Sequence, residues 1–142
     1  MNWREQAASS HYQTAVAIQQ QLRTGHVDEA SAGIEVLIEA LARSEKRALR
    51  SQLVRLMAHV LKWQTQPDHR TRSWAASIRS ARKEIKEIME ETPSLTEDVI
   101  KGMWESCLDT ATDQAEADMD QPVTIPSLTW EEVFSTDYRF RP

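Results

Sequence analysis

One apolar repeat constrains the fold of this chain more than any other feature. Large side chains recur at three- and four-residue spacing, which places them on one side of an α-helix; they are Ile34, Leu37, Ile38, Leu41, Ala48, Leu49, Leu53, Leu56, Val60 and Trp63. Between them, Glu45 is the polar residue that falls in this register. Pro67 ends the repeat, since the residue before a proline is pushed away from helical angles. The pattern predicts a single helix from about Asp28 to about Gln64, with a kink near Ser44 left open.

Two further helices flank this long one. An earlier helix is expected over 4–23 because apolar residues share one face there, and Gly25 follows as its C-cap; they are Ala8, Tyr12, Ala15, Ile18 and Leu22. A later helix is expected from Thr71 or Ser73, either of which can cap it, to a point before Pro93. Its stripe keeps a four-three-four-three spacing; the members are Trp74, Ile78, Ala81, Ile85 and Ile88.

A fourth helix is predicted after Ser94-Leu95-Thr96-Glu97, which has the form of a capping box. Its inward residues are expected to be Val99, Met103, Cys107, Ala111 and Ala115. The tail over 121–142 has two early prolines and then several apolar side chains, which argue against free disorder; they are Trp130, Val133, Phe134, Tyr138 and Phe140. We expect it to lie across the bundle, with one helical turn near 130–134. No period-two pattern indicates a strand. The fold class is therefore an all-α four-helix bundle over about 4–120, in a single domain of residues 1–142.

Composition narrows the class of protein. The chain has 142 residues, 27% of them charged, and one cysteine, Cys107. A lone cysteine forms no internal disulfide, which favours a reducing compartment. Neither a membrane-spanning apolar run nor a signal-peptide core is present in the sequence. These features predict a cytoplasmic protein that does not enter a membrane.

Charge is distributed unevenly along the chain. Residues 43–83 contain eleven Lys and Arg against two acids, a net charge of +9, whereas the rest of the chain carries −14. The basic segment either packs beside acidic neighbours within one fold or dimer, or forms an exposed surface that meets an anion.

Part of the sequence resembles a bacterial family catalogued as domain of unknown function 29. The similarity rests on four motifs: H-V-L-K-W-Q-T-Q-P over 59–67, R-S-W over 72–74, the Ile78 and Arg82 pair, and T-P-S-L over 92–95. It extends clearly from about 41 to 95 and more loosely over the whole chain. The resemblance implies a small all-helical domain and supplies no function.

One stretch departs from the family pattern. Ahead of these motifs the family resembles D-x-x-x-x-x-E-E-I-E-x-L-G, whereas residues 30–42 read A-S-A-G-I-E-V-L-I-E-A-L-A. Ala30, Val36 and Leu37 stand where that pattern has acids, while Glu39 is kept. If the family uses those carboxylates with His59 for metal or acid–base chemistry, the resemblance implies that this member has lost it.

The best candidate site is the corner around Pro67. Basic and aromatic residues gather there: Lys62, Trp63, Arg70, Arg72, Trp74, Arg79 and Lys83. Arginines bind phosphate or carboxylate through paired hydrogen bonds, and exposed donors at a helix start favour anions. Tryptophans can stack on a base or a guanidinium. The alternative interpretation is that both tryptophans belong to the core and the basic residues form a solvated face.

A second candidate is a buried polar network of Glu35, Glu39, His59 and Arg82. Arg82 shares the register of its helix's apolar stripe, so it needs a buried partner, and Glu35 or Glu39 is the expected one. His59 has no second ligand at helical spacing, so it is expected to be structural rather than a metal ligand. Cys107 is expected to be a buried thiol. No catalytic, metal or cofactor motif is present in the sequence.

Three function classes remain open. The sequence favours a non-enzymatic interaction module whose basic corner recognises an acidic protein partner or a second copy of the chain. The alternative is nucleic-acid or phosphate binding by the basic face, against which stands the acidic pI of about 5.4. The third is an enzyme with a degenerate site between helices.

Overall fold

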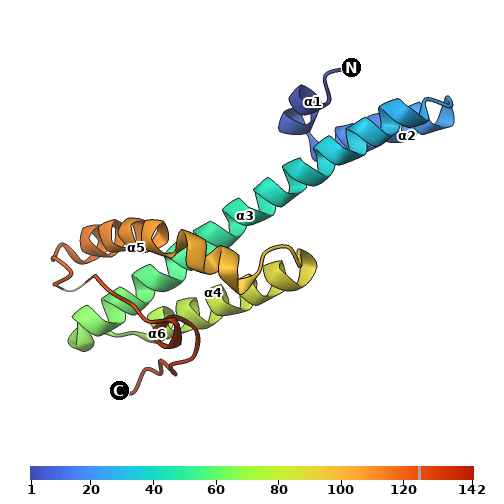
Figure 1. Cartoon of the computed structure of the whole chain (residues 1–142). Helices are drawn as coiled ribbons and strands as arrows, with labels where there is room; N and C mark the ends of the chain where they lie inside the picture. The colour runs from blue at the N-terminus through green and yellow to red at the C-terminus, as the bar shows by residue number, and fades with distance from the viewer. Residues whose placement is uncertain (125) are drawn as a thin grey trace. The chain divides into compact units, whose positions relative to one another are not determined.

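Helices make up nearly all regular structure in the computed structural model, which describes residues 1–124 and 126–142 (Figure 1). The elements in order are α1 (Trp3–Ser9), α2 (His11–Arg23), α3 (Val27–Thr65), the 3-10 turn η1 (Pro67–His69), α4 (Arg72–Glu91), α5 (Glu97–Met119) and α6 (Trp130–Phe134). No strand occurs among the described residues. The all-α class expected from the helical periodicity is confirmed.

The chain forms two compact units. Unit 1 comprises Met1–Arg47 and unit 2 comprises Ala48–Pro142. The helix α3 contributes its first part to unit 1 and its second part to unit 2. Each unit has its own cluster of buried apolar side chains, and the two clusters share no residue.

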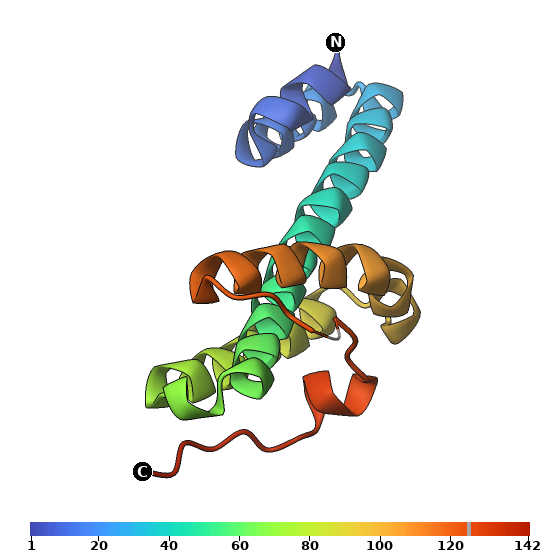
Figure 2. The same cartoon turned by 90° about the vertical axis from the view of Figure 1, so that its left-hand side faces the viewer.

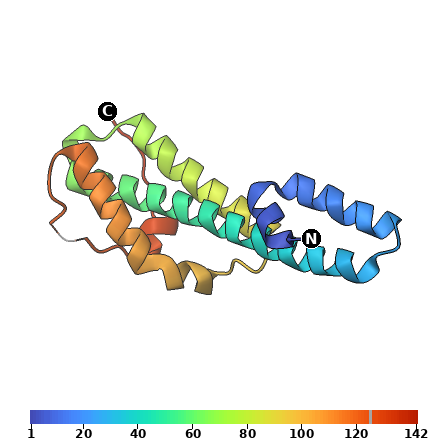
Figure 3. The ribbon, with the colours of Figure 1, turned by 90° about the horizontal axis from the view of Figure 1, so that it is seen from above.

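The long helix is confirmed as one continuous element of 39 residues, without a break at Ser44. It ends where Pro67 was expected to end it, and η1 follows directly (Figure 3). Gly25 precedes it with a φ of +82°, a left-handed conformation that glycine adopts without strain. This residue makes the tight connection between α2 and α3.

Unit 1 is a helical hairpin with a short extra helix. Figures 1 and 3 show α2 beside the first part of α3, running in the opposite direction. The expected single helix over 4–23 is divided at Ser10, whose side chain accepts from Gln13 N at 3.1 Å and caps α2. Trp3 on α1 packs with Ile18 and Ala30, and its ring nitrogen donates to Glu29 Oε1 at 2.9 Å.

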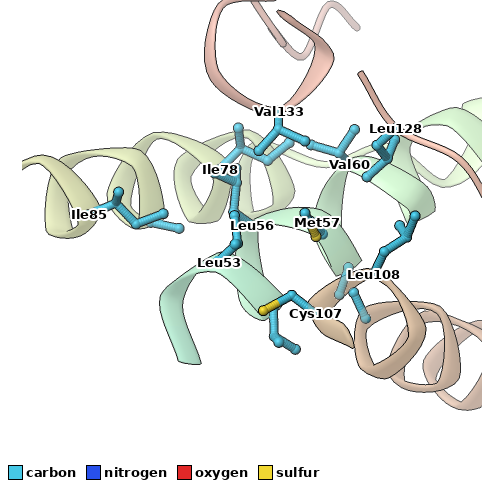
Figure 4. Close-up of a cluster of buried hydrophobic side chains, with 14 of the residues drawn as sticks. Leu53, Leu56, Met57, Val60, Ile78, Ile85, Cys107, Leu108, Leu128 and Val133 are labelled. Carbon is cyan, nitrogen blue, oxygen red and sulfur yellow. The ribbon is translucent and has the colours of Figure 1, made fainter. Parts of the chain in front are cut away.

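Unit 2 holds the larger core. The second part of α3 is covered by α4, α5 and α6, and side chains from all four helices meet there (Figure 4). The members of α3 that are less than 2% exposed are Leu49, Leu53, Leu56, Met57, Val60 and Leu61. From the other helices Ile78, Cys107 and Val133 are similarly buried. The apolar stripe predicted for the second part of the long helix therefore forms this core.

Helix α4 begins as expected, because Thr71 accepts from Trp74 N at 3.0 Å and caps it. The capping box predicted at Ser94 is wrong. Helix α5 starts at Glu97, two residues later than that box requires, and its N-cap Thr96 makes no side-chain cap. Leu95 N donates to Thr92 O at 2.9 Å in a turn where the box would need a helix, and the Leu95 side chain is buried at 6% exposure.

The C-terminal tail packs on unit 2, as the sequence predicts. Helix α6 over Trp130–Phe134 is the expected helical turn, and a capping box of Thr129 and Glu132 starts it. Figure 2 shows the tail turning back after α5 and passing through α6 towards the C-terminus. Leu128, Val133 and Tyr138 enter the core of this unit.

Candidate functional site

The predicted corner lies where α3 ends, η1 turns and α4 begins, and its inner residues are structural. Lys62 is only 7% exposed. Its Nζ donates to Asp118 Oδ2 on α5 at 3.2 Å and lies 5.4 Å from the centre of the Trp74 ring. The ion pair with Asp118 compensates the charge of a lysine that would otherwise be buried without a partner. Lys62 is therefore committed to joining α3, α4 and α5.

Trp63 belongs to the core of unit 2, at 5% exposure. The Tyr138 ring meets it edge-on at 5.8 Å between centroids. Arg70 covers it from the other side, with the guanidinium carbon 4.8 Å from the ring centre and Nε donating to Trp63 O at 2.9 Å. This carbonyl is one of those left free at the end of α3. Arg70 thus closes the helix, although its side chain is still partly exposed.

Two predicted residues form an exposed basic surface instead. Arg72 and Arg79 are exposed on α4, and together with Arg139 of the tail they line a cavity of about 260 Å³. Ala75 and Phe140 complete its lining, and we call it the arginine cavity. None of these five residues is acidic. Three guanidinium groups in one hollow can offer paired hydrogen bonds to carboxylate or phosphate oxygens.

A second hollow adjoins the arginine cavity, since Arg139 and Phe140 line both. It has a volume of about 520 Å³ and includes Arg70 and Arg141. Two acids, Asp68 and Asp137, also line it, and Asp137 Oδ2 lies 2.6 Å from Arg139 Nε. The second hollow therefore has charges of both signs in its lining, whereas the charged residues that line the arginine cavity are all basic and one of them, Arg139, is paired with Asp137 outside it.

Lys83 is exposed on α4, one helical turn after Arg79. Its Nζ lies 4.0 Å from Glu87 Oε1 on the same helix. Exposed pairs of this kind contribute little free energy, so the ammonium group stays available to a ligand. Of the seven predicted corner residues, the structure thus commits Lys62, Trp63, Arg70 and Trp74 to packing and exposes the other three.

The predicted pairing of Arg82 with Glu35 or Glu39 is wrong. Arg82 Nε donates to Val133 O at 2.8 Å, and Nη2 donates to Glu132 O at 3.4 Å. Burial lowers the pKa of this guanidinium, and the neighbouring Tyr138 and Asp137 oppose that shift. Backbone carbonyls of α6 have replaced the carboxylate as partner. Glu35 and Glu39 themselves are exposed on α3.

His59 is partly buried on α3, and its Nδ1 lies 2.8 Å from Arg55 O. A carbonyl oxygen only accepts, so Nδ1 carries the proton. Burial lowers the pKa of this imidazole, and the positive charges of Lys62 and Arg55 add to that effect. The ring is therefore neutral near pH 7.

Neither a metal-binding cluster nor an activated thiol is found in the part of the chain that the structure describes. No cluster of three or more His, Cys, Asp or Glu side chains there could hold a metal ion. Cys107 is buried, and burial raises the pKa of its thiol. Arg50 Nη1 lies 3.6 Å from Sγ and weakly opposes this shift.

Sequence reasoning missed the tail's contribution to the corner, namely Arg139, Phe140 and Arg141. A signal was present, because the chain ends in R-F-R-P, two arginines around an aromatic residue. What the sequence lacks is any local sign that the tail returns to α4.

Comparison with known proteins gives one match. The family model described as Domain of unknown function DUF29 matches residues 12–139. No curated protein and no solved structure matches the chain. Among the described residues, no helix has the length and apolar character needed to cross a membrane.

Proposed function

The chain belongs to the family described as Domain of unknown function DUF29, and because that description assigns no activity, we propose from the corner's geometry that the protein is a non-enzymatic interaction module. It binds an acidic segment of a partner protein. The arginine cavity receives the carboxylates, with Arg72, Arg79 and Arg139 as the binding residues and Lys83 beside them on α4.

One observation carries this proposal: three guanidinium groups from two distant parts of the chain share a hollow with no acid in its lining. Arg139 is paired with Asp137, which lies outside this lining, whereas Arg72 and Arg79 have no ion pair among the described residues. Positive charge of this kind in a small hollow raises the local concentration of anions. Guanidinium groups also form a planar fork that matches a carboxylate. Phe140 adds an apolar wall for the rest of a bound side chain.

The choice of an acidic protein over nucleic acid follows from the surroundings. Asp68 and Asp137 line the adjoining hollow and would repel a continuous phosphate backbone. The whole chain carries a net charge of −5, and repulsion at long range grows with the charge of the partner, so it opposes an extended nucleic acid more than a short acidic segment. Nucleic-acid binding is the second candidate, because Arg72, Arg79, Lys83 and Lys86 are all exposed along α4.

A binding titration tests the proposal. The probes are a glutamate-rich peptide and a single-stranded oligonucleotide of equal charge, each measured by fluorescence anisotropy at about 50 and 200 mM salt. We expect the peptide to bind and the double variant Arg72→Ala/Arg79→Ala to lose at least about tenfold in affinity, or about 1.4 kcal/mol. The matched control is Arg43→Ala/Lys46→Ala, which removes the same charge from exposed residues of unit 1.

Two results would count against it. Equal losses in both double variants would mean that net charge, and not the arginine cavity, governs binding. Tighter binding of the oligonucleotide, with affinity that falls steeply with salt, would favour the second candidate.

A further inference from the structure

Unit 1 exposes an unusual amount of apolar surface. All the exposed large hydrophobic side chains among the described residues lie in this unit; they are Met1, Tyr12, Val16, Leu22, Val27, Ile34, Ile38 and Leu41. Tyr12 is 78% exposed and Ile38 is 60% exposed. Single apolar residues on a surface need no explanation, but their confinement to one hairpin does.

Apart from Met1 and Val16, these side chains share one face of the hairpin. On α3 Gly33 lies against Ile18 of α2, and Ala40 is buried about two turns later. Ile34 and Leu41 each follow one of these two residues and lie about 100° further round the helix axis. On α2 the buried residue against Gly33 is Ile18, and Leu22 and Tyr12 lie about 40° and about 120° round the axis from it in the same sense. The two helices are antiparallel and face each other. A displacement in the same sense from the buried side of each helix therefore brings these side chains of α2 and of α3 to one side of the hairpin. Six residues form this apolar face: Tyr12, Leu22, Val27, Ile34, Ile38 and Leu41.

The apolar face also continues a surface that is buried elsewhere on α3. Ile38 lies 18 residues before Leu56, which is five helical turns, so both belong to the same apolar repeat of the sequence. Leu56 is fully buried in unit 2, under helices that belong to that unit. The same stripe is therefore covered in the second part of α3 and uncovered in the first.

The core of unit 1 is too small to account for a stable hairpin. Its buried apolar cluster consists of Trp3, Ile18 and Ala30, with three partly buried neighbours. Units of about 40 residues usually need a further source of stability, such as oligomerisation. The apolar face is the surface on which this unit could gain one.

We propose that the apolar face joins two copies of this chain, hairpin against hairpin, into a four-helix bundle. The exposed fractions amount to roughly 600 Å² of apolar surface per copy for side chains of these sizes. This reaches the lower end of the roughly 600–1,000 Å² per partner of standard protein interfaces. Two hairpins related by a two-fold axis cover each other's faces, and the assembly closes without leaving an apolar surface for a third copy.

The chemistry of the face suits a second copy better than other partners. Between His11 and Arg23, α2 has no charged residue, and on α3 the register of the face is uncharged from Val27 to Leu41, with Glu45 as the next member. A two-fold interface places a surface on itself, so any charge near the axis would meet its like. The absence of Lys and Arg from the face also removes the electrostatic attraction that nucleic acid or an anionic lipid surface would require.

Light scattering after size exclusion tests this interface on the full chain at about 100 μM, far above the dissociation constant of a standard-size interface. We expect a particle of twice the 16.3 kDa chain mass. The variant Ile38→Glu should elute as a monomer, because it places a charge in the centre of the face. Ala32→Glu is the control, since it adds the same side chain at an exposed position on the other side of α3.

A gentler double variant, Tyr12→Gln/Ile38→Gln, covers the case in which Ile38→Glu unfolds unit 1. Glutamine is a good helix former, so circular dichroism should retain the wild-type helix content while the particle mass falls to that of one chain. A monomeric wild-type protein would overturn the proposal. A dimer that survives both face variants would also overturn it, as would one that is lost with Ala32→Glu or only with Arg72→Ala/Arg79→Ala.

Discussion

Arg82 ties the C-terminal tail to the helices of unit 2. Its guanidinium donates to the carbonyls of Glu132 and Val133 near the end of α6, and lies 5.5 Å from the Tyr138 ring. Carbonyls at a helix end lack partners within the helix, and a cation there complements their partial negative charge. The Tyr138 hydroxyl donates to the same Glu132 carbonyl at 2.7 Å. Arg82 thus acts as the C-terminal cap of α6.

Replacing Arg82 should therefore destabilise the protein through backbone groups and not through a carboxylate. We expect Arg82→Ala to lower the free energy of unfolding by about 1–3 kcal/mol, the cost of leaving buried acceptors without donors. Arg82→Lys should recover only part of this, because one ammonium cannot reproduce the fork. Urea denaturation measures both. Arg79→Ala, at an exposed position of the same helix, should change stability by less than about 0.5 kcal/mol, and an equal loss there would refute the capping role.

The position of Arg82 could be predicted from the sequence, but its partner could not. Its register relative to Ile78 and Ile85 places it at the edge of the core, as the structure has it. Any residue supplies a carbonyl, however, so no residue type marks Glu132 and Val133 as acceptors. The same holds for the arginine cavity, whose third arginine comes from the tail.

At the scale of elements, prediction worked where one signal extended over many residues. The long helix was predictable because its apolar phase persists from Ile34 to Trp63, and many small contributions outweigh any local preference. Single caps were less informative. Ser10 with Gln13 has the capping-box pattern and divides α1 from α2, whereas Ser94 with Glu97 has the same pattern and caps nothing. A cap contributes only about 1 kcal/mol, so packing of a neighbour such as Leu95 can override it.

Two helical glycines give an opposed pair of predictions. A Cβ on Gly33 would lie 2.8 Å from Ile18 Cγ1 and 3.0 Å from the Trp3 ring, whereas one on Gly102 in α5 would meet no atom within 4 Å. Gly33→Ala should therefore lower the free energy of unfolding by about 1–3 kcal/mol despite the higher helix propensity of alanine. Gly102→Ala should raise it by about 0.5–1 kcal/mol. Thermal unfolding followed by circular dichroism checks both, and a stabilising Gly33→Ala would mean that α1 does not pack on α3.

At the scale of the whole molecule, one helix serves two cores of unequal size. The first part of α3 packs on a cluster of three buried residues, and the second part lies in the much larger core of unit 2. Local stability follows the amount of buried apolar contact, so a helix with a continuous hydrogen-bond ladder need not be uniformly stable. The proposed interface on the apolar face would reduce this difference by adding contacts to the first part only.

Amide hydrogen exchange should reveal the difference along α3. We expect amides of residues 31–45 to exchange faster than those of residues 53–61, which lie in the most buried stretch of the chain. Mass spectrometry of peptides from the quenched protein measures both segments in one sample. If the apolar face joins two copies, dilution below the dissociation constant should speed exchange in 31–45 and leave 53–61 unchanged. Equal protection of the two segments at every concentration would mean that α3 opens as one cooperative unit with its surroundings. That result would contradict the expectation that the smaller core of unit 1 stabilises its part of α3 less than the core of unit 2 stabilises the rest.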